Sequence, residues 1–131
     1  MVLGVGTDLI EIARMRNSVE RFGQRFLGRV FTPAEIEYCL GKKKGAVESF
    51  AARFAAKEAG AKALGTGISR GVGWKDIEVR REAGERPRLI WSGRARDRAR
   101  ELGVARAELS LTHSRDLAMA FVVVEGDGVK A

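Results

Sequence analysis

The sequence predicts an α+β fold in which helices pack on an antiparallel sheet. Helical patterns and a helix-capping motif fill the first half of the chain, whereas short apolar runs separated by turn-like segments fill the second half. A length of 131 residues, of which 45% are hydrophobic and two are proline, fits one domain with one core. We therefore expect a single domain over residues 1–125 and a loose tail over residues 126–131.

The chain opens with a predicted strand that leads into a basic helix. Residues 2–10 are apolar and rich in glycine, interrupted by Thr7 and Asp8, as in a buried strand. Residues 12–27 then change to a basic helical pattern. One face of this helix is expected to carry three arginines at intervals of seven and four residues, namely Arg14, Arg21 and Arg25.

Two further helices follow, each with a recognisable end. Thr32 is followed by a proline, and Glu35 stands three residues after Thr32, which is typical of a capping box. A short helix should therefore begin at this point. A longer helix is expected over residues 49–64, with Gly65 as its C-terminal cap. A loop with four glycines spans residues 65–73, where the backbone can approach a ligand closely.

The second half is expected to form strands around one charged helix. The turn-like segment AGERP suggests a hairpin between its first two β-like runs. We expect strands over residues 74–81, 88–91, 108–112 and 117–125, and an exposed helix over residues 94–102.

Composition and charge restrict the location and the partners. The longest purely apolar runs are far shorter than the ~20 residues of a membrane-spanning helix, so we expect no membrane span. The first residues lack the basic segment and apolar stretch of an export signal, which favours the cytoplasm. A net charge of +7 indicates an anionic partner, and on charge alone this is a nucleic acid, an acidic protein or a multiply phosphorylated small molecule.

A metal site in this chain would have to use oxygen ligands. The single cysteine, Cys39, and the single histidine, His113, are too few for a transition-metal site. Cys39 is expected to be a small buried hydrophobe without a catalytic role. His113 stands at the end of a predicted strand, where it contacts a phosphate, carries a proton or serves only as a hydrogen-bonded turn residue.

The helix over residues 49–64 holds charged residues beside its apolar stripe. The stripe that should face the core consists of Phe50, Phe54, Ala61 and Leu64. Lys57 falls within this stripe and must either extend its ammonium to solvent or meet an anion. Glu58 lies at the edge, where it either pairs with Lys62 one turn later, as on many solvated helices, or belongs to a site.

Asp8 and Glu58 are candidate ligands for one divalent cation. A carboxylate is unexpected in an apolar strand, so Asp8 could have a function there. Alternatively, Asp8 could cap the following helix. Two carboxylates among lysines and arginines suit Mg²⁺ together with a diphosphate, because the cation takes oxygen ligands and the basic side chains offset the remaining phosphate charge. The sequence leaves open whether the two carboxylates meet.

Five segments, spread over nearly the whole chain, carry a family resemblance. They are GVGTDLIEI at residues 4–12, FT at 31–32 with Glu35 and YC at 38–39, FAARFAAKEA at 50–59, KALGTG at 62–67, and LSLTHS at 109–114. In this order the chain resembles the bacterial holo-acyl-carrier-protein synthases of the 4′-phosphopantetheinyl transferase superfamily. One departure is Gly60, where the family often has a bulky aromatic, so that helix packing or the pantetheine pocket would differ.

The resemblance implies the 4′-phosphopantetheinyl transferase fold, a homotrimer with active sites between subunits, and roles for individual residues. Asp8 and Glu58 would bind Mg²⁺, and Lys62 would join them in catalysis. The implied coenzyme A site consists of Arg53, Lys57, Lys62, Gly65 and His113. The helix with Arg14, Arg21 and Arg25 would dock the acidic acyl carrier protein.

The implied activity is a Mg²⁺-dependent transfer in fatty acid biosynthesis. A serine hydroxyl of apo acyl carrier protein attacks the β-phosphate of coenzyme A, and adenosine 3′,5′-bisphosphate leaves. A metal-bound water, Glu58 or Asp8, or another water could accept the serine proton. Two alternatives are a noncatalytic trimer that binds acidic proteins and a nucleic-acid-binding module. Only 7% of residues are aromatic and no reading motif is present, so we expect no nucleic-acid partner.

Overall fold

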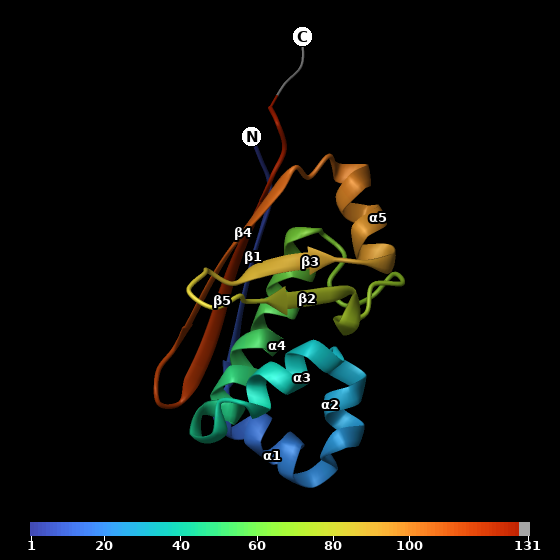
Figure 1. Ribbon diagram of the computed structural model, residues 1–131. Helices are drawn as coiled ribbons and strands as arrows, with labels where there is room; N and C mark the ends of the chain where they lie inside the picture. The colour runs from blue at the N-terminus through green and yellow to red at the C-terminus, as the bar shows by residue number, and fades with distance from the viewer. Residues whose placement is uncertain (129–131) are drawn as a thin grey trace.

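A computed structural model describes residues 1–128, and within them it contains a three-stranded sheet, a hairpin and five α-helices (Figure 1). The larger sheet is antiparallel with strand order β1-β5-β4, and β2 pairs with β3. The elements are β1 (Val2–Glu11), α1 (Ile12–Phe22), α2 (Gln24–Val30), α3 (Pro33–Leu40), α4 (Ala46–Ala63), β2 (Ile77–Arg80), β3 (Arg88–Trp91), α5 (Gly93–Leu102), β4 (Arg106–His113) and β5 (Leu117–Glu125). This architecture confirms the predicted α+β class.

Helix α4 lies at the centre of the fold. It packs on β1, β5 and β4 of the sheet, on β2 of the hairpin, and on α1 and α3 (Figure 1). Alanine and glycine fill much of its length, so neighbouring elements approach closely and the helix is buried nearly all round. The prediction of a single core-facing stripe was therefore wrong, and Phe54, which it included, is only half-buried.

Two glycines allow β1 to lie directly on α4. A Cβ atom added to Gly6 would stand 1.9 Å from the carbonyl oxygen of Ala59, and one added to Gly4 would stand 2.1 Å from that of Ala63. Both contacts are with backbone atoms, which cannot move aside as a side chain can. Because β1 is this close to α4, the next residues of the strand, including Asp8, stand beside the last turns of the helix.

The three-stranded sheet is covered by α4 on one face only. Side chains of β1 and β5 alternate between the face toward α4 and the opposite face. Large hydrophobic residues remain exposed on the opposite face, which we call the apolar sheet face: Val5, Leu9, Leu117, Met119 and Phe121. The size of these exposed side chains suggests a surface that another protein covers.

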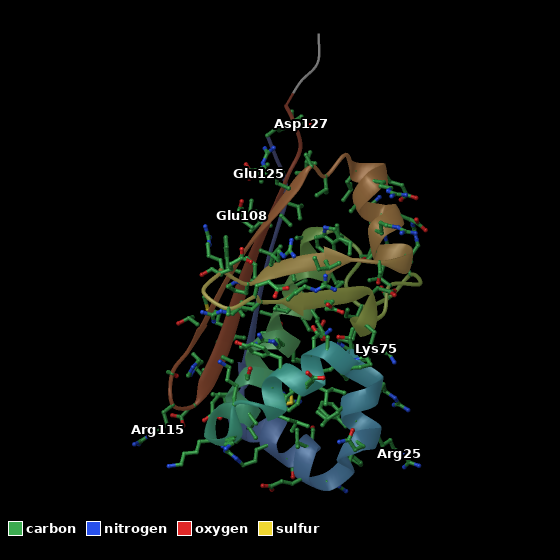
Figure 2. The ribbon with its side chains drawn as sticks, viewed as in Figure 1. Arg25, Lys75, Glu108, Arg115, Glu125 and Asp127 are labelled. Atoms are coloured by element: carbon green, nitrogen blue, oxygen red, sulfur yellow. The ribbon has the colours of Figure 1, made fainter. Side chains whose placement is uncertain are left out.

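The basic segment over residues 12–27 forms two helices rather than one. Gly23 has φ of 53°, a left-handed value that ends α1 and turns the chain into α2. Arg14 and Arg21 therefore lie on α1, whereas Arg25 lies on α2, where it projects outward from the molecule (Figure 2). The predicted single arginine face is corrected to a surface formed by two helices.

The sequence signals for two other helix ends predicted the structure correctly. Thr32 Oγ1 accepts the Glu35 backbone N–H at 3.2 Å, and Glu35 Oε1 accepts the Thr32 N–H at 2.9 Å, which confirms the capping box. Gly65 follows α4 with φ of 82°, as expected of a helix-ending glycine. The predicted strand over residues 74–81 is shorter, because Trp74–Asp76 forms a 3-10 turn before β2.

The C-terminal residues that the structure describes are tied to the sheet. The Gly126 N–H donates to the Met1 carbonyl oxygen at 2.9 Å, and Arg106 Nη1 lies 3.4 Å from Asp127 Oδ1. Gly126 and Asp127, which were expected to belong to a loose tail over residues 126–131, thus contact the sheet, and residues 129–131 lie outside the described part of the chain. Within residues 1–128, no helix is long and apolar enough to cross a membrane.

Candidate active site

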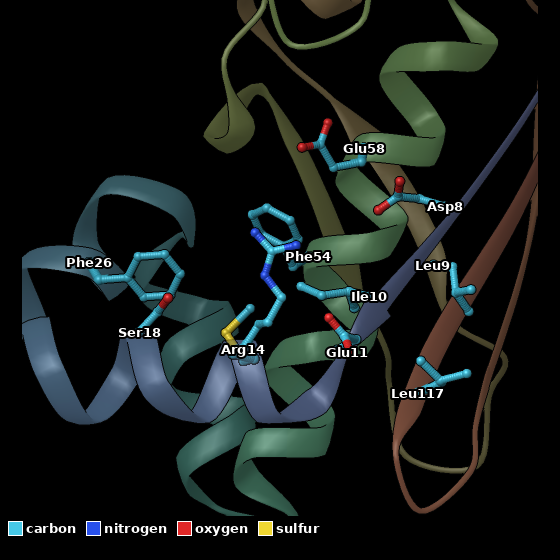
Figure 3. Close-up of a pocket in the computed structure, with 11 residues that line it drawn as sticks. Asp8, Leu9, Ile10, Glu11, Arg14, Ser18, Phe26, Phe54, Glu58 and Leu117 are labelled. Carbon is cyan, nitrogen blue, oxygen red and sulfur yellow. The ribbon is translucent and has the colours of Figure 1, made fainter.

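The packing of β1 on α4 brings Asp8, Glu58 and Lys62 together. Lys62 Nζ lies 3.1 Å from Asp8 Oδ1 and donates to the Thr7 carbonyl oxygen at 3.0 Å. The alternative in which Glu58 pairs with Lys62 on a solvated face is not what forms, since no ion pair within residues 1–128 involves Glu58. The carboxylates of Asp8 and Glu58 extend into the same space (Figure 3).

The electrostatics of this site favour a cation between the two carboxylates. Burial raises the pKa of Glu58, and the negative charge of Asp8 raises it further, while the Trp74 indole and the Lys62 ammonium act in the opposite direction. A second positive charge at this point would relieve the repulsion between the carboxylates. Their oxygen atoms are the ligands that Mg²⁺ prefers, and one or two protein carboxylates together with substrate phosphates are a usual Mg²⁺ ligand set.

These two carboxylates would therefore fit a magnesium ion that takes its remaining ligands from outside the protein. In the described part of the chain, no group of three or more histidine, cysteine, aspartate or glutamate residues comes together as a ready-made metal site. A hard cation with several ligands from outside the protein agrees with this two-carboxylate set better than a structural metal does.

A cavity of about 430 Å³ opens beside the two carboxylates (Figure 3). Its lining comes from β1, α1, α2, α4 and the start of β5 and consists of Asp8, Leu9, Ile10, Glu11, Arg14, Met15, Ser18, Phe26, Phe54, Glu58 and Leu117. Leu9 and Leu117 also belong to the apolar sheet face. The cavity, which we call the carboxylate cavity, thus borders the uncovered side of the sheet.

Arg53 and His113 line a different cavity of about 370 Å³, on the α3 and β4 side of α4. The Arg53 guanidinium lies 4.1 Å from the ring centroid of Tyr38 and donates to Ser49 Oγ at 3.0 Å. Burial acts to raise the pKa of Tyr38, but the nearby Lys42 and Arg53 hold it below the usual tyrosine value. This basic cavity suits an anion, and it shares no lining residue with the carboxylate cavity.

Lys57 is not at either cavity. Its side chain is fully buried, and Nζ donates to Glu35 Oε1 at 2.6 Å, to the Ile77 carbonyl oxygen at 2.8 Å and to the Trp74 carbonyl oxygen at 3.1 Å. An ammonium has three hydrogens, so none is left for a phosphate. The predicted role of Lys57 at the coenzyme A phosphates is therefore corrected. Burial lowers its pKa, and the charge of Glu35 opposes that change.

The predicted partner-binding arginines occupy one end of the molecule. Arg14 points into the carboxylate cavity (Figure 3). The Arg21 guanidinium lies over the exposed ring of Phe22, 5.5 Å from its centroid. Arg25 lines a shallow cavity of about 450 Å³ whose other lining residues are Phe22, Phe26 and Arg29. This combination of exposed arginine and phenylalanine suits an acidic partner with an apolar contact residue.

The sequence interpretation did not predict the contact of Glu35 with Lys57 or the proximity of the Trp74 indole to Glu58. The only structural role predicted for Glu35 was helix capping, yet its carboxylate also pairs with the Lys57 ammonium and accepts the Val79 N–H at 2.7 Å. A lysine within an apolar stripe signals that an anion must be near, but nothing in the sequence points to Glu35 in particular. Cys39 behaves as expected, since it is fully buried and burial raises the pKa of its thiol.

Gly60 packs against the hairpin. A Cβ atom at this position would lie 3.3 Å from side-chain atoms of Ile77 and Leu89 and 3.5 Å from the Trp91 ring. The hairpin thus occupies the space that a larger residue at position 60 would need, which assigns the departure at Gly60 to helix packing.

Comparisons with known proteins show which family this chain resembles. Residues 4–122 match the family model described as the 4′-phosphopantetheinyl transferase superfamily. A holo-[acyl-carrier-protein] synthase of Koribacter versatilis is 54% identical over 125 residues, covering 95% of this chain and 99% of the relative. The corresponding protein of Moorella thermoacetica is 52% identical, with 95% and 94% covered.

Solved structures of such synthases are also similar. The Neisseria meningitidis enzyme superposes with a TM-score of 0.85 at 37% identity, covering 95% of this chain and 99% of that chain. The Helicobacter pylori enzyme, solved in complex with coenzyme A, gives a TM-score of 0.81 at 33% identity, with 92% and 99% covered.

Proposed function

This chain belongs to the 4′-phosphopantetheinyl transferase superfamily, and we propose that it transfers the 4′-phosphopantetheine group of coenzyme A to a serine of apo acyl carrier protein in the cytoplasm, as a step that serves fatty acid biosynthesis. The observation that carries the proposal is the meeting of Asp8, Glu58 and Lys62 beside a cavity. The two carboxylates could bind a cation, and the lysine beside them could bind a phosphate.

In the proposed reaction, the serine oxygen forms a bond to the β-phosphorus of coenzyme A. The bond from that phosphorus to the bridging oxygen breaks, adenosine 3′,5′-bisphosphate leaves, and the serine proton passes to a base. Asp8 and Glu58 would hold Mg²⁺, which when bound orients the diphosphate and offsets its charge. Lys62 would add positive charge at the same phosphates, because half of its side chain is exposed beside Asp8.

The two cavities support a site shared between copies of the chain. The carboxylate cavity lies at the β1 side of the sheet, and the basic cavity with Arg53 and His113 lies at the β4 side. We infer that one coenzyme A contacts the carboxylate cavity of one copy and the basic cavity of the next copy. A head-to-tail ring of three copies would set the β1 side of one against the β4 side of the next.

The apolar sheet face supports the same trimer. Phe121, Met119 and Leu9 are 42%, 39% and 58% exposed, which is unfavourable for large hydrophobic side chains of an isolated domain. Because Leu9 also lines the carboxylate cavity, a second copy on this face would narrow that cavity. Arg21 and Arg25, which lie on α1 and α2 at one end of the molecule, would remain free to dock the acidic carrier protein.

Neutral substitutions of the two carboxylates test the proposed metal pair. Asp8→Asn and Glu58→Gln keep the size of each side chain and remove its charge, so both should abolish measurable Mg²⁺ binding in calorimetric titrations with coenzyme A present and should reduce transfer by at least about 10²-fold. Glu11→Gln, which alters another carboxylate of the same cavity, is the matched control. Normal Mg²⁺ binding and transfer in folded Asp8→Asn/Glu58→Gln would exclude the pair.

A further inference from the structure

Trp74 carries an indole N–H with no visible partner. The Nε1 atom is buried and forms no hydrogen bond to any of the described residues. A buried donor without an acceptor is costly, so its persistence needs a physical reason. The adjacent Lys57, by contrast, uses every one of its donors.

The backbone of Trp74 is held firmly from two sides. Its carbonyl oxygen accepts from Lys57 Nζ at 3.1 Å, and Lys57 is itself fixed by Glu35 at 2.6 Å. On the other side, Asp76 closes the 3-10 turn η2 (Trp74–Asp76), with its Oδ2 accepting the Gly73 N–H at 3.0 Å. The position of Trp74 is thus set by a buried ion pair and a capped turn.

The ring of Trp74 contacts one of the residues that line the carboxylate cavity. It packs on Phe54 with ring centroids 6.2 Å apart and planes inclined by 30°. Phe54 and Glu58 stand one helical turn apart on α4 and line the same cavity. The indole is also close enough to Glu58 to favour the charged form of that carboxylate. Glu58 is therefore the acceptor within reach of the free N–H.

We propose that Trp74 is a positioning residue, whose indole N–H donates to the Glu58 carboxylate when the site is loaded and so fixes the direction in which Glu58 presents its other oxygen. The Glu35–Lys57 pair acts one step further back, by holding the turn that carries Trp74. This inference rests on the proposed function of Glu58 as a metal ligand. In this proposal, buried Lys57 acts on the site indirectly, by holding the Trp74 backbone, and does not contact a phosphate.

The matched pair Trp74→Phe and Trp91→Phe tests the proposal, because the chain contains only these two tryptophans and both belong to the hairpin region. Trp74→Phe keeps an aromatic ring and removes the N–H. It should weaken Mg²⁺ binding, measured calorimetrically with coenzyme A, by about tenfold, as the loss of a group that orients a metal ligand does. The KM for the carrier protein should not change, and Trp91→Phe should bind Mg²⁺ normally.

A second measurement uses the unaltered protein and does not depend on how the variants fold. In its NMR spectrum, the indole N–H signal of Trp74, assigned by comparison with Trp91→Phe, should move on addition of Mg²⁺ and coenzyme A. The Trp91 signal should stay in place. In Glu58→Gln the Trp74 signal should no longer respond.

The outcomes separate this inference from the function on which it rests. If Glu58→Gln loses Mg²⁺ binding while Trp74→Phe binds normally and the indole signal does not move, the positioning role is overturned and the metal pair stands. If Trp91→Phe weakens binding as much as Trp74→Phe does, general loosening of the hairpin explains the loss and the proposal is overturned. Normal Mg²⁺ binding by Glu58→Gln overturns the metal pair and the inference together.

Discussion

Lys57 and Lys62 stand five residues apart on α4, and both form an ion pair, yet they should respond in opposite ways to the same substitution. The Lys57 and Glu35 side chains are completely buried, whereas the Lys62 side chain is 51% exposed. Methionine has a similar length and no charge, so Lys57→Met and Lys62→Met are closely matched changes. We predict that the first mainly destabilises the fold and that the second mainly impairs the reaction.

The magnitudes follow from burial. Lys57→Met leaves the Glu35 carboxylate in the core with only the Thr32 and Val79 N–H groups as donors. Removing one partner of a buried pair costs about 3–5 kcal/mol, a large part of the ~5–15 kcal/mol by which a domain is stable. For a chain of this size the melting temperature should fall by roughly 10–20 °C. An exposed pair contributes about 0–1 kcal/mol, so Lys62→Met should melt almost normally.

Thermal and urea unfolding followed by circular dichroism measure the stability difference, with both variants at one protein concentration because an oligomer unfolds in a concentration-dependent way. Transfer assays at a temperature where both are folded complete the comparison. Lys62→Met should lose roughly 10²-fold in turnover. Lys57→Met should keep a normal KM for coenzyme A. Equal stability of the two variants, together with a raised coenzyme A KM in Lys57→Met, would show that Lys57 contacts the substrate and does not mainly stabilise the core.

Three further predictions concern packing, assembly and docking. Gly6→Ala should cost about 3 kcal/mol or more in unfolding experiments, because its Cβ would meet a backbone carbonyl of α4, whereas Gly28→Ala has open space around it and should be neutral or slightly stabilising. Phe121→Asp should convert the proposed trimer to inactive monomers in sedimentation equilibrium, and a wild-type monomer with full activity would contradict the proposed assembly. Arg21→Glu/Arg25→Glu should raise the apparent KM for the carrier protein and weaken its salt dependence, with the coenzyme A KM unchanged; unaltered carrier-protein kinetics would count against the docking surface.

The parts of the fold that depend on local chemistry were predictable from the sequence. The capping box at Thr32 and Glu35 acts within four residues, and the glycine after α4 is likewise a local signal. The division of the basic segment into two helices was not predicted. A single glycine, Gly23, makes the turn, and glycine inside a helical pattern is often tolerated.

The candidate site was harder to predict because it depends on contacts between distant segments. Asp8 and Glu58 meet only because Gly4 and Gly6 allow β1 to lie against α4, and periodicity does not reveal which strand a helix covers. The partner of Lys57 lies 22 residues earlier in the chain. The sequence could show that this lysine needed an anion, but only the tertiary packing identifies the anion.

The most direct test of the account is mass spectrometry of apo acyl carrier protein after incubation with this chain, coenzyme A and Mg²⁺. The proposed transferase function predicts that the carrier protein gains the mass of one phosphopantetheine group on a serine. The gain should require Mg²⁺, and Glu58→Gln should prevent it while Glu11→Gln does not. A carrier protein of unchanged mass with the folded wild-type chain, or full modification by Glu58→Gln, would contradict these predictions.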